Sequence, residues 1–194
     1  MAVVLSATLL AACGSTPKVQ RIDTESVTDL SGKWNDTDSR LVSQEMIADV
    51  LSRPWIEEHR RTEGNKPTII VGSIRNLSHE HINVQTFVAD MERELINSGR
   101  VDFVASSTER TGVREERLDQ DLNSREDTRN AMGQEIGADY MLTGTINTIV
   151  DAEGRRQVTY YQVDLTLISM KDNRKVWIGQ KKIKKDIQRS SYRP

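Results

Sequence analysis

Histidines and carboxylates are the side chains of this chain that could bind a metal or carry out acid–base chemistry. His79 and His81 stand two residues apart in the segment SHEH, and His59 is the third histidine. Zinc requires three or four converging ligands, and nothing in the sequence fixes His59 beside the other two. A polar loop in front of a helix explains SHEH better. We therefore predict no metal and no cofactor, and keep a hydrolase using His79 and His81 as the least favoured alternative.

Three pairs of carboxylates stand out in stretches with many charged residues. They are Glu57 with Glu58, Glu115 with Glu116, and Asp119 with Asp121. Hydrolysis of a glycosidic bond needs two carboxylates in one cleft with separated pKa values, whereas a solvated helix face explains charged neighbours without any function. The nucleophile elbow and the phosphate-binding glycine motifs are missing from the sequence. We predict no catalytic residue and a protein that is not an enzyme.

Cys13 is the only cysteine of the chain, and its surroundings predict covalent attachment to lipid. It ends the segment LAAC, an aliphatic residue and two small residues before a cysteine, which matches the lipobox of bacterial lipoproteins. Residues 1–12 are apolar and uncharged, which is typical of the apolar part of a signal peptide. A signal peptide also begins with positive charge, which residues 1–12 lack, so a trimmed or mis-assigned start and an ordinary hydrophobic tail stay open.

The residues around Cys13 also predict a compartment. Lipid chains on Cys13 would hold the protein to a membrane, and stable anchoring takes more than one chain. Gly14 follows the cysteine, where an Asp would often signal retention in the inner membrane. We therefore expect a palmitoylated protein in the outer membrane of a diderm bacterium, facing the periplasm. The net charge of −2 gives no broad attraction to nucleic acid, and none is expected as a partner.

Composition divides the chain into four segments. A signal peptide, residues 1–12, precedes a polar tether, residues 13–37, which has no apolar periodicity. The 23 residues from Gly14 to Asp36 span at most ~80 Å when fully extended. Residues 38–187 carry periodic apolar residues and are expected to form one folded domain. Residues 188–194 are a flexible C-terminal tail.

Helix signals begin in the first half of the predicted domain. Asp38 is the expected cap of a first helix, and Pro54 starts a second, short one. Asn83 caps a third helix, which ends at Gly99. Residues 107–123 are charged and predicted to be helical with a poor apolar face.

One more helix is predicted before the last strands. Ser124 and Asp127 form a capping box for a helix that runs through Met132 and Ile136 and stops at Gly137.

Strand signals come from β-branched and alternating residues. The predicted strands cover residues 66–74, 101–106, 140–150, 158–170 and 175–185. In the fourth, Tyr161, Val163 and Leu165 alternate with polar residues, which indicates one buried face. Short turns join the last three strands, so they form an antiparallel meander. The predicted class is α+β, a mixed or mostly antiparallel sheet packed with helices.

Two features of the domain have open interpretations. Lys181, Lys182, Lys184 and Lys185 either protect an edge strand from pairing with another chain, which we favour, or meet an acidic partner. Trp34 either anchors the tether to the domain or contacts a partner.

Taken together, the chain resembles the LpoB-like lipoproteins, activators of penicillin-binding proteins. The resemblance covers residues 34–183 and is carried by KPTIIVGSIRNLSHEHINVQTFVADMERELINSGRVDFVAS, AMGQEIGADYMLTGTI and KVWIGQKKI. It implies a fold like the TolB N-terminal domain and a lipid anchor at Cys13. It also implies a non-enzymatic function: binding and stimulating a bifunctional penicillin-binding protein, and so regulating peptidoglycan synthesis, cell wall biogenesis and cell shape. It assigns no partner-binding residue.

The length of the tether keeps a second hypothesis open. A short tether suits a partner at the outer membrane better than one at the inner membrane. An envelope scaffold lipoprotein of the same fold, part of a secretion or surface-fibre apparatus, is therefore the alternative.

Overall fold

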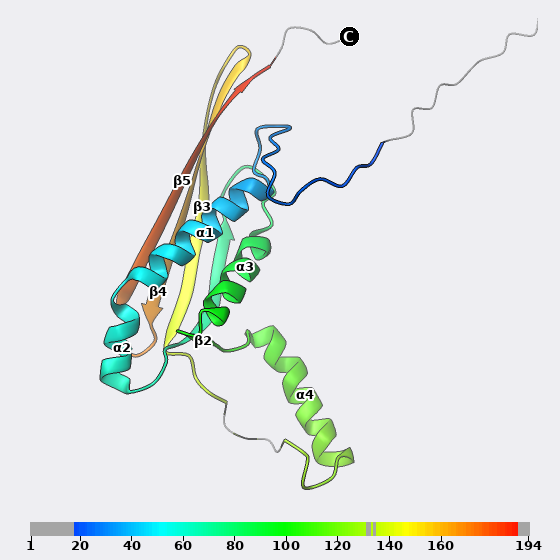
Figure 1. Ribbon diagram of the computed structural model, residues 1–194, viewed down its shortest axis with the longest axis vertical. Helices are drawn as coiled ribbons and strands as arrows, with labels where there is room; N and C mark the ends of the chain where they lie inside the picture. Colours follow the sequence, from blue (N-terminus) through cyan, green and yellow to red (C-terminus); the bar gives the residue numbers. More distant parts are fainter. Residues whose placement is uncertain (1–17, 131–132, 134, 190–194) are drawn as a thin grey trace, which may run out of the picture.

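The computed structural model describes residues 18–130, 133 and 135–189 (Figure 1). The predicted signal peptide and Cys13 lie outside the described residues, as does Met132. The helices are α1 (Asp36–Ser52), α2 (Trp55–Glu63), α3 (Val84–Asn97) and α4 (Ser107–Asn123). The strands are β1 (Thr68–Asn76), β2 (Asp102–Phe103), β3 (Tyr140–Glu153), β4 (Arg156–Ser169) and β5 (Lys175–Gln188).

The strands form one sheet in the order β2-β1-β3-β4-β5. β1 pairs in parallel with both β2 and β3, because helices connect these strands. β3, β4 and β5 form an antiparallel meander, as their short connections predict. The expected α+β class with a mixed, mostly antiparallel sheet is therefore confirmed, and β5 is an edge strand.

One face of the sheet packs against α1 and α3 (Figure 1). The alternation predicted for β4 is confirmed, since Tyr161, Val163 and Leu165 are fully buried on this face. The helices contribute the other half of the core: Val42, Met46 and Val50 from α1, and Phe87, Val88, Met91 and Leu95 from α3. Because apolar burial is the main favourable term in folding, this layer holds the domain together.

Helix α1 crosses the edge strand β5 at a glycine. A Cβ at Gly179 would overlap the ring of Trp177 and lie 2.7 Å from the sulfur of Met46. The Trp177 indole N–H donates to Asp49 Oδ2 of α1, at 2.7 Å. The absent side chain at Gly179 therefore permits the close approach of helix and strand.

The opposite face of the sheet carries a row of polar side chains along β4. Gln162 donates to Asp164 Oδ2 at 2.8 Å, and Gln180 of β5 donates to Asp164 Oδ1 at 2.7 Å. Tyr160, Gln162 and Asp164 are half-exposed. Polar pairs of this kind, one within β4 and one between β4 and β5, keep this face of the sheet compatible with water.

The first helix begins three residues earlier than the sequence predicts. Asn35, not Asp38, is the cap: its side-chain oxygen accepts from the Asp38 N–H at 3.1 Å. Asp38 is the third helical residue, and its Oδ2 accepts from the Asn35 N–H at 2.9 Å. The prediction was wrong because both residues are good caps, and the reciprocal pair satisfies two helix N–H groups where a single cap satisfies one.

Local signals for the next two helices are confirmed. Pro54 directly precedes α2. Asn83 caps α3 by accepting from the Gln85 N–H at 3.1 Å. The helix ends at Asn97, and it is followed by Ser98 and then by Gly99, which has a φ of 66°. A positive φ is the conformation that favours glycine after a helix.

The helix predicted from Ser124 to Gly137 is wrong for the described residues. Residues 124–130 form a bend and a turn, in which Arg125 pairs with Asp127 at 2.6 Å, and residues 135–138 are irregular. Ile136 is 74% exposed, so it covers no apolar surface. Without such a surface a short helix has little stability in water, whatever its cap.

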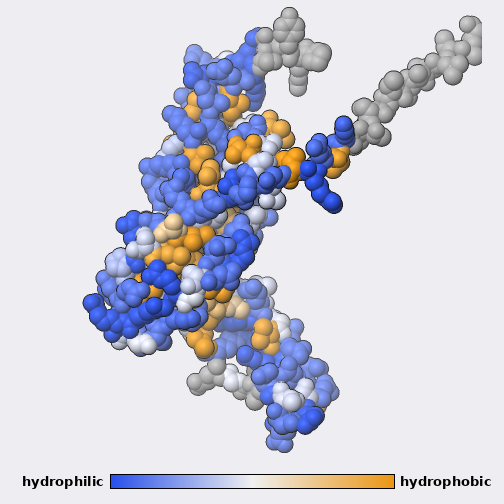
Figure 2. Space-filling view, viewed as in Figure 1, coloured by the Kyte–Doolittle hydropathy of each residue, from blue (hydrophilic) through white to orange (hydrophobic). Residues whose placement is uncertain are grey.

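Strand β2 is shorter than the strand predicted there, and α4 lies outside the packed layer. The strand expected over residues 101–106 is reduced to β2, because Ser106 instead caps α4 through a capping box with Glu109. Helix α4 forms as predicted, and none of its residues is buried. It projects from the sheet (Figure 1) and is mostly hydrophilic in the space-filling view (Figure 2).

Candidate functional sites at the two ends of the sheet

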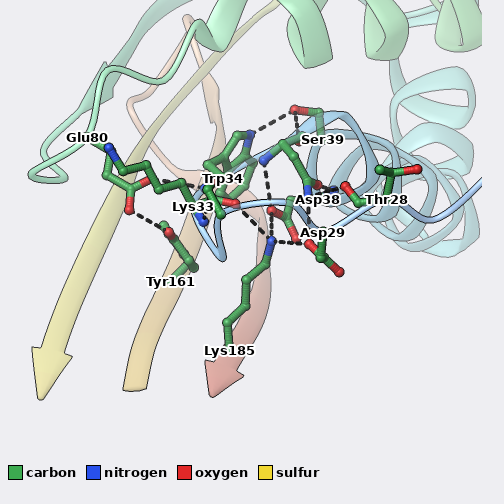
Figure 3. Close-up of polar contacts among 11 residues, drawn as sticks. Thr28, Asp29, Lys33, Trp34, Asp38, Ser39, Glu80, Tyr161 and Lys185 are labelled. Atoms are coloured by element: carbon green, nitrogen blue, oxygen red, sulfur yellow. Dashed lines mark hydrogen bonds and ion pairs between the residues drawn. The ribbon is translucent and has the colours of Figure 1, made fainter. Parts of the chain in front are cut away.

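Residues 28–35, at the end of the predicted tether, are bound to the folded body. We call this region the tether junction: residues 28–35 with Asp38, Ser39, Glu80, Tyr161 and Lys185. Figure 3 shows the labelled residues of this region converging from the segment before α1, the first turn of α1, the loop before α3, and strands β4 and β5. The junction therefore fixes the point at which the tether leaves the domain.

Lys185 of β5 is the centre of the junction. Its ammonium group donates to Asp29 Oδ1 at 2.9 Å, to the Lys33 carbonyl at 3.0 Å, and lies 2.7 Å from Asp38 Oδ2. These three acceptors match its three N–H donors. The side chains of Lys185 and Asp38 are only 12% and 4% exposed. Burial alone would lower the pKa of Lys185, but the hydrogen bonds to Asp38 and Asp29 outweigh it, and the pKa is raised.

Trp34 forms the second half of the junction. Its backbone N–H donates to Glu80 Oε2 at 3.0 Å, and its indole N–H donates to Ser39 Oγ at 2.8 Å. Its ring meets the edge of Tyr161 with centroids 5.4 Å apart. Of the two interpretations of Trp34, the structure supports the anchor.

Glu80 connects the tether to the sheet, and the sequence did not reveal it. Its Oε1 accepts from the Tyr161 hydroxyl at 2.8 Å. Burial, then this hydrogen bond, raises the pKa of Tyr161, so the phenol stays protonated and donates. Glu80 lies within SHEH, where attention falls on the histidines. Its partners Trp34 and Tyr161 are far away in sequence, and no local pattern indicates such a contact.

The lysines of β5 divide between the two faces of the sheet. Lys181 pairs with Glu45 of α1, and Lys185 lies in the junction. Lys182 and Lys184 are exposed. The position of β5 at the sheet edge agrees with the favoured interpretation of these lysines.

A cleft of about 550 Å³ lies at the other end of the sheet, between α2 and the turn that joins β4 to β5. We call it the α2 cleft. Its lining includes Trp55, Glu58 and His59 from α2, Asp139 and Tyr140 at the start of β3, and Met170 and Arg174 from the turn. The cleft is thus built from three segments that are distant in sequence.

His59 is a buried residue that positions Tyr140. Its Nε2 lies 3.0 Å from Asn65 Oδ1 and its Nδ1 lies 3.1 Å from the Tyr140 hydroxyl. Because an amide oxygen only accepts, we assign the ring proton to Nε2, and Nδ1 accepts from Tyr140. The Tyr140 ring also contacts the edge of Trp55 with centroids 5.3 Å apart. Both ring nitrogens of His59 are therefore occupied by structural hydrogen bonds.

Negatively charged groups dominate the electrostatic field at the Tyr140 hydroxyl. Burial, followed by the charges of Asp139 and Glu63, raises its pKa. Two acidic residues of the cleft are paired: Glu63 of α2 with Lys171 across the cleft at 3.1 Å, and Asp172 with Arg174 within the β4–β5 turn at 2.5 Å. Asp139 Oδ2 accepts from the Thr68 N–H at 2.8 Å and lies 3.7 Å from His59 Nε2.

The residues that the sequence offered for chemistry do not gather in the described part of the chain. His59 lies in α2, whereas His79 and His81 lie in the loop before α3. Among residues 18–130, 133 and 135–189, no three His, Cys, Asp or Glu side chains are placed to hold a metal ion. The carboxylate pairs lie on α2 and α4, and all but Asp121 are exposed.

The tether junction and the α2 cleft are far apart. Lys185 and Lys175 are ten residues apart on β5, which corresponds to ~33 Å along an extended strand. Figure 1 shows the segment before α1 near one end of the meander, and α2 with the β4–β5 turn at the other. None of the described helices has the length and apolar character needed to cross a membrane.

Solved structures share only a distant likeness with this chain. Lipoprotein GNA1162 from Neisseria meningitidis is 17% identical with a TM-score of 0.39, and the match covers 62% of this chain and 83% of that one. The LpoB C-terminal domain from Escherichia coli is 13% identical with a TM-score of 0.36, covering 73% and 96%. That from Salmonella enterica is 14% identical with a TM-score of 0.34, covering 67% and 93%.

The family assignment rests on a different comparison. Among curated protein sequences, no relative matches. The family model of the peptidoglycan-synthase activator LpoB, however, matches residues 38–183, which extend from α1 into β5 and include the α2 cleft. This chain therefore belongs to the LpoB family of peptidoglycan-synthase activators.

Proposed function

We propose that this protein is a lipid-anchored activator that binds a bifunctional penicillin-binding protein and stimulates peptidoglycan synthesis without catalysis of its own. The single observation that carries this proposal is the family match over residues 38–183. The arrangement of His59 agrees with it, because this buried histidine holds Tyr140 in place and is not free to take protons from a substrate.

The anchor in this proposal is Cys13, with the protein on the periplasmic side of the outer membrane. Its lipobox and the apolar residues before it are the support, as set out from the sequence. About 15 residues separate Cys13 from the tether junction at Thr28, and such a chain spans at most ~50 Å. The folded body adds ~33 Å between the junction and the α2 cleft. Together these lengths would allow the cleft end to reach at most ~80 Å from the anchor.

Binding and lipidation are tested separately. The full-length protein, purified in detergent, should retain a bifunctional penicillin-binding protein of the same bacterium in a pull-down. Metabolic labelling with palmitate should mark the wild type and not Cys13→Ser, and Cys13→Ser should leave the membrane fraction. Absence of binding to every bifunctional synthase would contradict the activator function. Co-purification with an outer-membrane channel in place of a synthase would favour the scaffold alternative.

A further inference from the structure

The α2 cleft is preformed, because each of its walls is held by hydrogen bonds within the chain. The Trp55 indole N–H donates to the Val50 carbonyl at 2.8 Å, which fixes the start of α2. The Met170 N–H donates to the Asp139 carbonyl at 2.8 Å, which fixes the turn against β3. His59 fixes Tyr140 between these walls. A partner entering the cleft therefore meets a surface that needs little reordering.

Charge in the cleft favours a cation. Of its basic residues, Lys171 and Arg174 are each paired with a carboxylate of the cleft, which leaves the single positive charge of exposed Arg61 against the two carboxylates of Glu58 and Asp139. Glu58 is exposed on the cleft side of α2 and, among the described residues, has no basic group within 4.0 Å. Glu58 and Asp139 thus leave a net negative charge in the lining of the cleft, which also includes the Tyr140 ring, and the face of an aromatic ring attracts cations.

We propose that the α2 cleft docks a basic side chain, arginine or lysine, of the partner synthase, with Glu58, Asp139 and Tyr140 as its contacts. This inference rests on the proposed function. A volume of about 550 Å³ is sufficient for one such side chain and its neighbours. The cleft also lies at the opposite end of the sheet from the tether junction, so attachment of the tether at the junction leaves this end free for a partner.

Charge reversal at Glu58 tests the docking directly. Full-length Glu58→Lys should bind the bifunctional synthase at least about tenfold more weakly than wild type, because a like charge replaces an attractive one at a binding site. Glu153→Lys makes the same change in the β3–β4 hairpin at the opposite end of the sheet, and it should bind like wild type. Wild-type affinity should fall as salt rises, and Glu58→Gln should reduce that dependence.

A second pair of variants probes the cleft without altering α2. Met170, 51% exposed in the β4–β5 turn, and Ile149, 67% exposed on β3, are both apolar surface residues. Met170→Arg adds bulk and positive charge at the cleft, and should weaken synthase binding. Ile149→Arg makes the same change far from the cleft and should not. Circular dichroism of each variant is the check that it is folded. Glu58→Gln removes the negative charge without adding a positive one, so weaker synthase binding by this variant cannot come from an added charge.

The outcomes separate this inference from the proposed function. If wild type binds and activates the synthase while Glu58→Lys and Met170→Arg bind equally well, docking in the cleft is overturned and the activator function stands. If wild type neither binds nor activates any bifunctional synthase, the proposed function fails, and the docking fails with it. If Glu58→Lys and Met170→Arg bind the synthase weakly while Glu153→Lys and Ile149→Arg bind like wild type, both the docking in the cleft and the proposed function are supported.

Discussion

At the tether junction, Lys185 finds three acceptors within its own chain, whereas at the α2 cleft, which Asp139 also lines, Glu58 faces solvent. Both regions are rich in charge, and they lie at opposite ends of one sheet. Polar groups satisfied within the chain stabilise one arrangement of it. Charges left exposed in a preformed cleft are available to a partner. The junction is therefore a structural site, and the cleft is the better candidate for recognition.

The largest effect on stability is expected at the junction. Lys185→Met leaves Asp38, only 4% exposed, without its cation, and should lower the free energy of unfolding by about 3 kcal/mol. Lys182→Met, in the same strand but exposed, should change it by less than about 0.5 kcal/mol. Urea unfolding of both variants measures the difference. Equal stability of the two variants would show that the junction is no more than a surface contact.

A smaller effect is expected for the aromatic half of the junction. Trp34→Ala removes the edge contact with Tyr161 and the hydrogen bond to Ser39, and should cost about 2 kcal/mol. It should also expose the chain at Lys33, whose carbonyl is held by Lys185. Limited digestion with trypsin, followed by mass spectrometry, should then show faster cleavage after Lys33 in Trp34→Ala. Unchanged cleavage would mean that Trp34 does not hold the tether.

At the cleft, loss of a single hydroxyl should have a modest effect. Tyr140→Phe removes the hydrogen bond to His59 and keeps the ring. We expect a loss of about 1 kcal/mol in urea unfolding. Synthase binding should be nearly unchanged, because the ring and the carboxylates remain. A stability loss as large as that of Lys185→Met would place the cleft among the structural sites and remove the contrast between the two ends.

The smallest expected effect is on the pH dependence of stability. The hydrogen bonds of Asp29 to Lys185 and then to Asn35 lower its pKa from 3.8. Asp29 thus binds protons less readily when folded than when unfolded, so its contribution is present above its ordinary pKa and is lost as pH falls below it. Urea unfolding from about pH 5 to about pH 3 should show a smaller drop in stability for Lys185→Met than for wild type. An identical drop would contradict the role of Lys185.

Elements specified by neighbouring residues could be predicted from the sequence. Asn83 caps α3 through a residue two positions away, and the buried face of β4 follows from alternation alone. The helix predicted at Ser124 was wrong because a capping box supplies only the start of a helix. A helix also needs an apolar surface to cover, and exposed Ile136 has none.

The two candidate sites depend on contacts between distant residues, which sequence patterns do not encode. Glu80 and Tyr161 are 81 residues apart, as are His59 and Tyr140. The histidines drew attention to SHEH, yet the residue that connects this loop to the tether is Glu80. Composition likewise marked Glu58 as one of a charged pair, and only the fold places it in the same cleft as Asp139.

The rate of peptidoglycan synthesis tests the central claim most directly. A bifunctional penicillin-binding protein is assayed with lipid-linked precursor, with and without the full-length protein, and cross-linked product is measured over time. The account predicts a faster rate that saturates with added protein, with Glu58→Lys requiring more protein and Glu153→Lys behaving like wild type. A rate that never rises above the rate of the synthase alone, even at the highest concentration of added protein, would contradict the proposed function as a synthase activator.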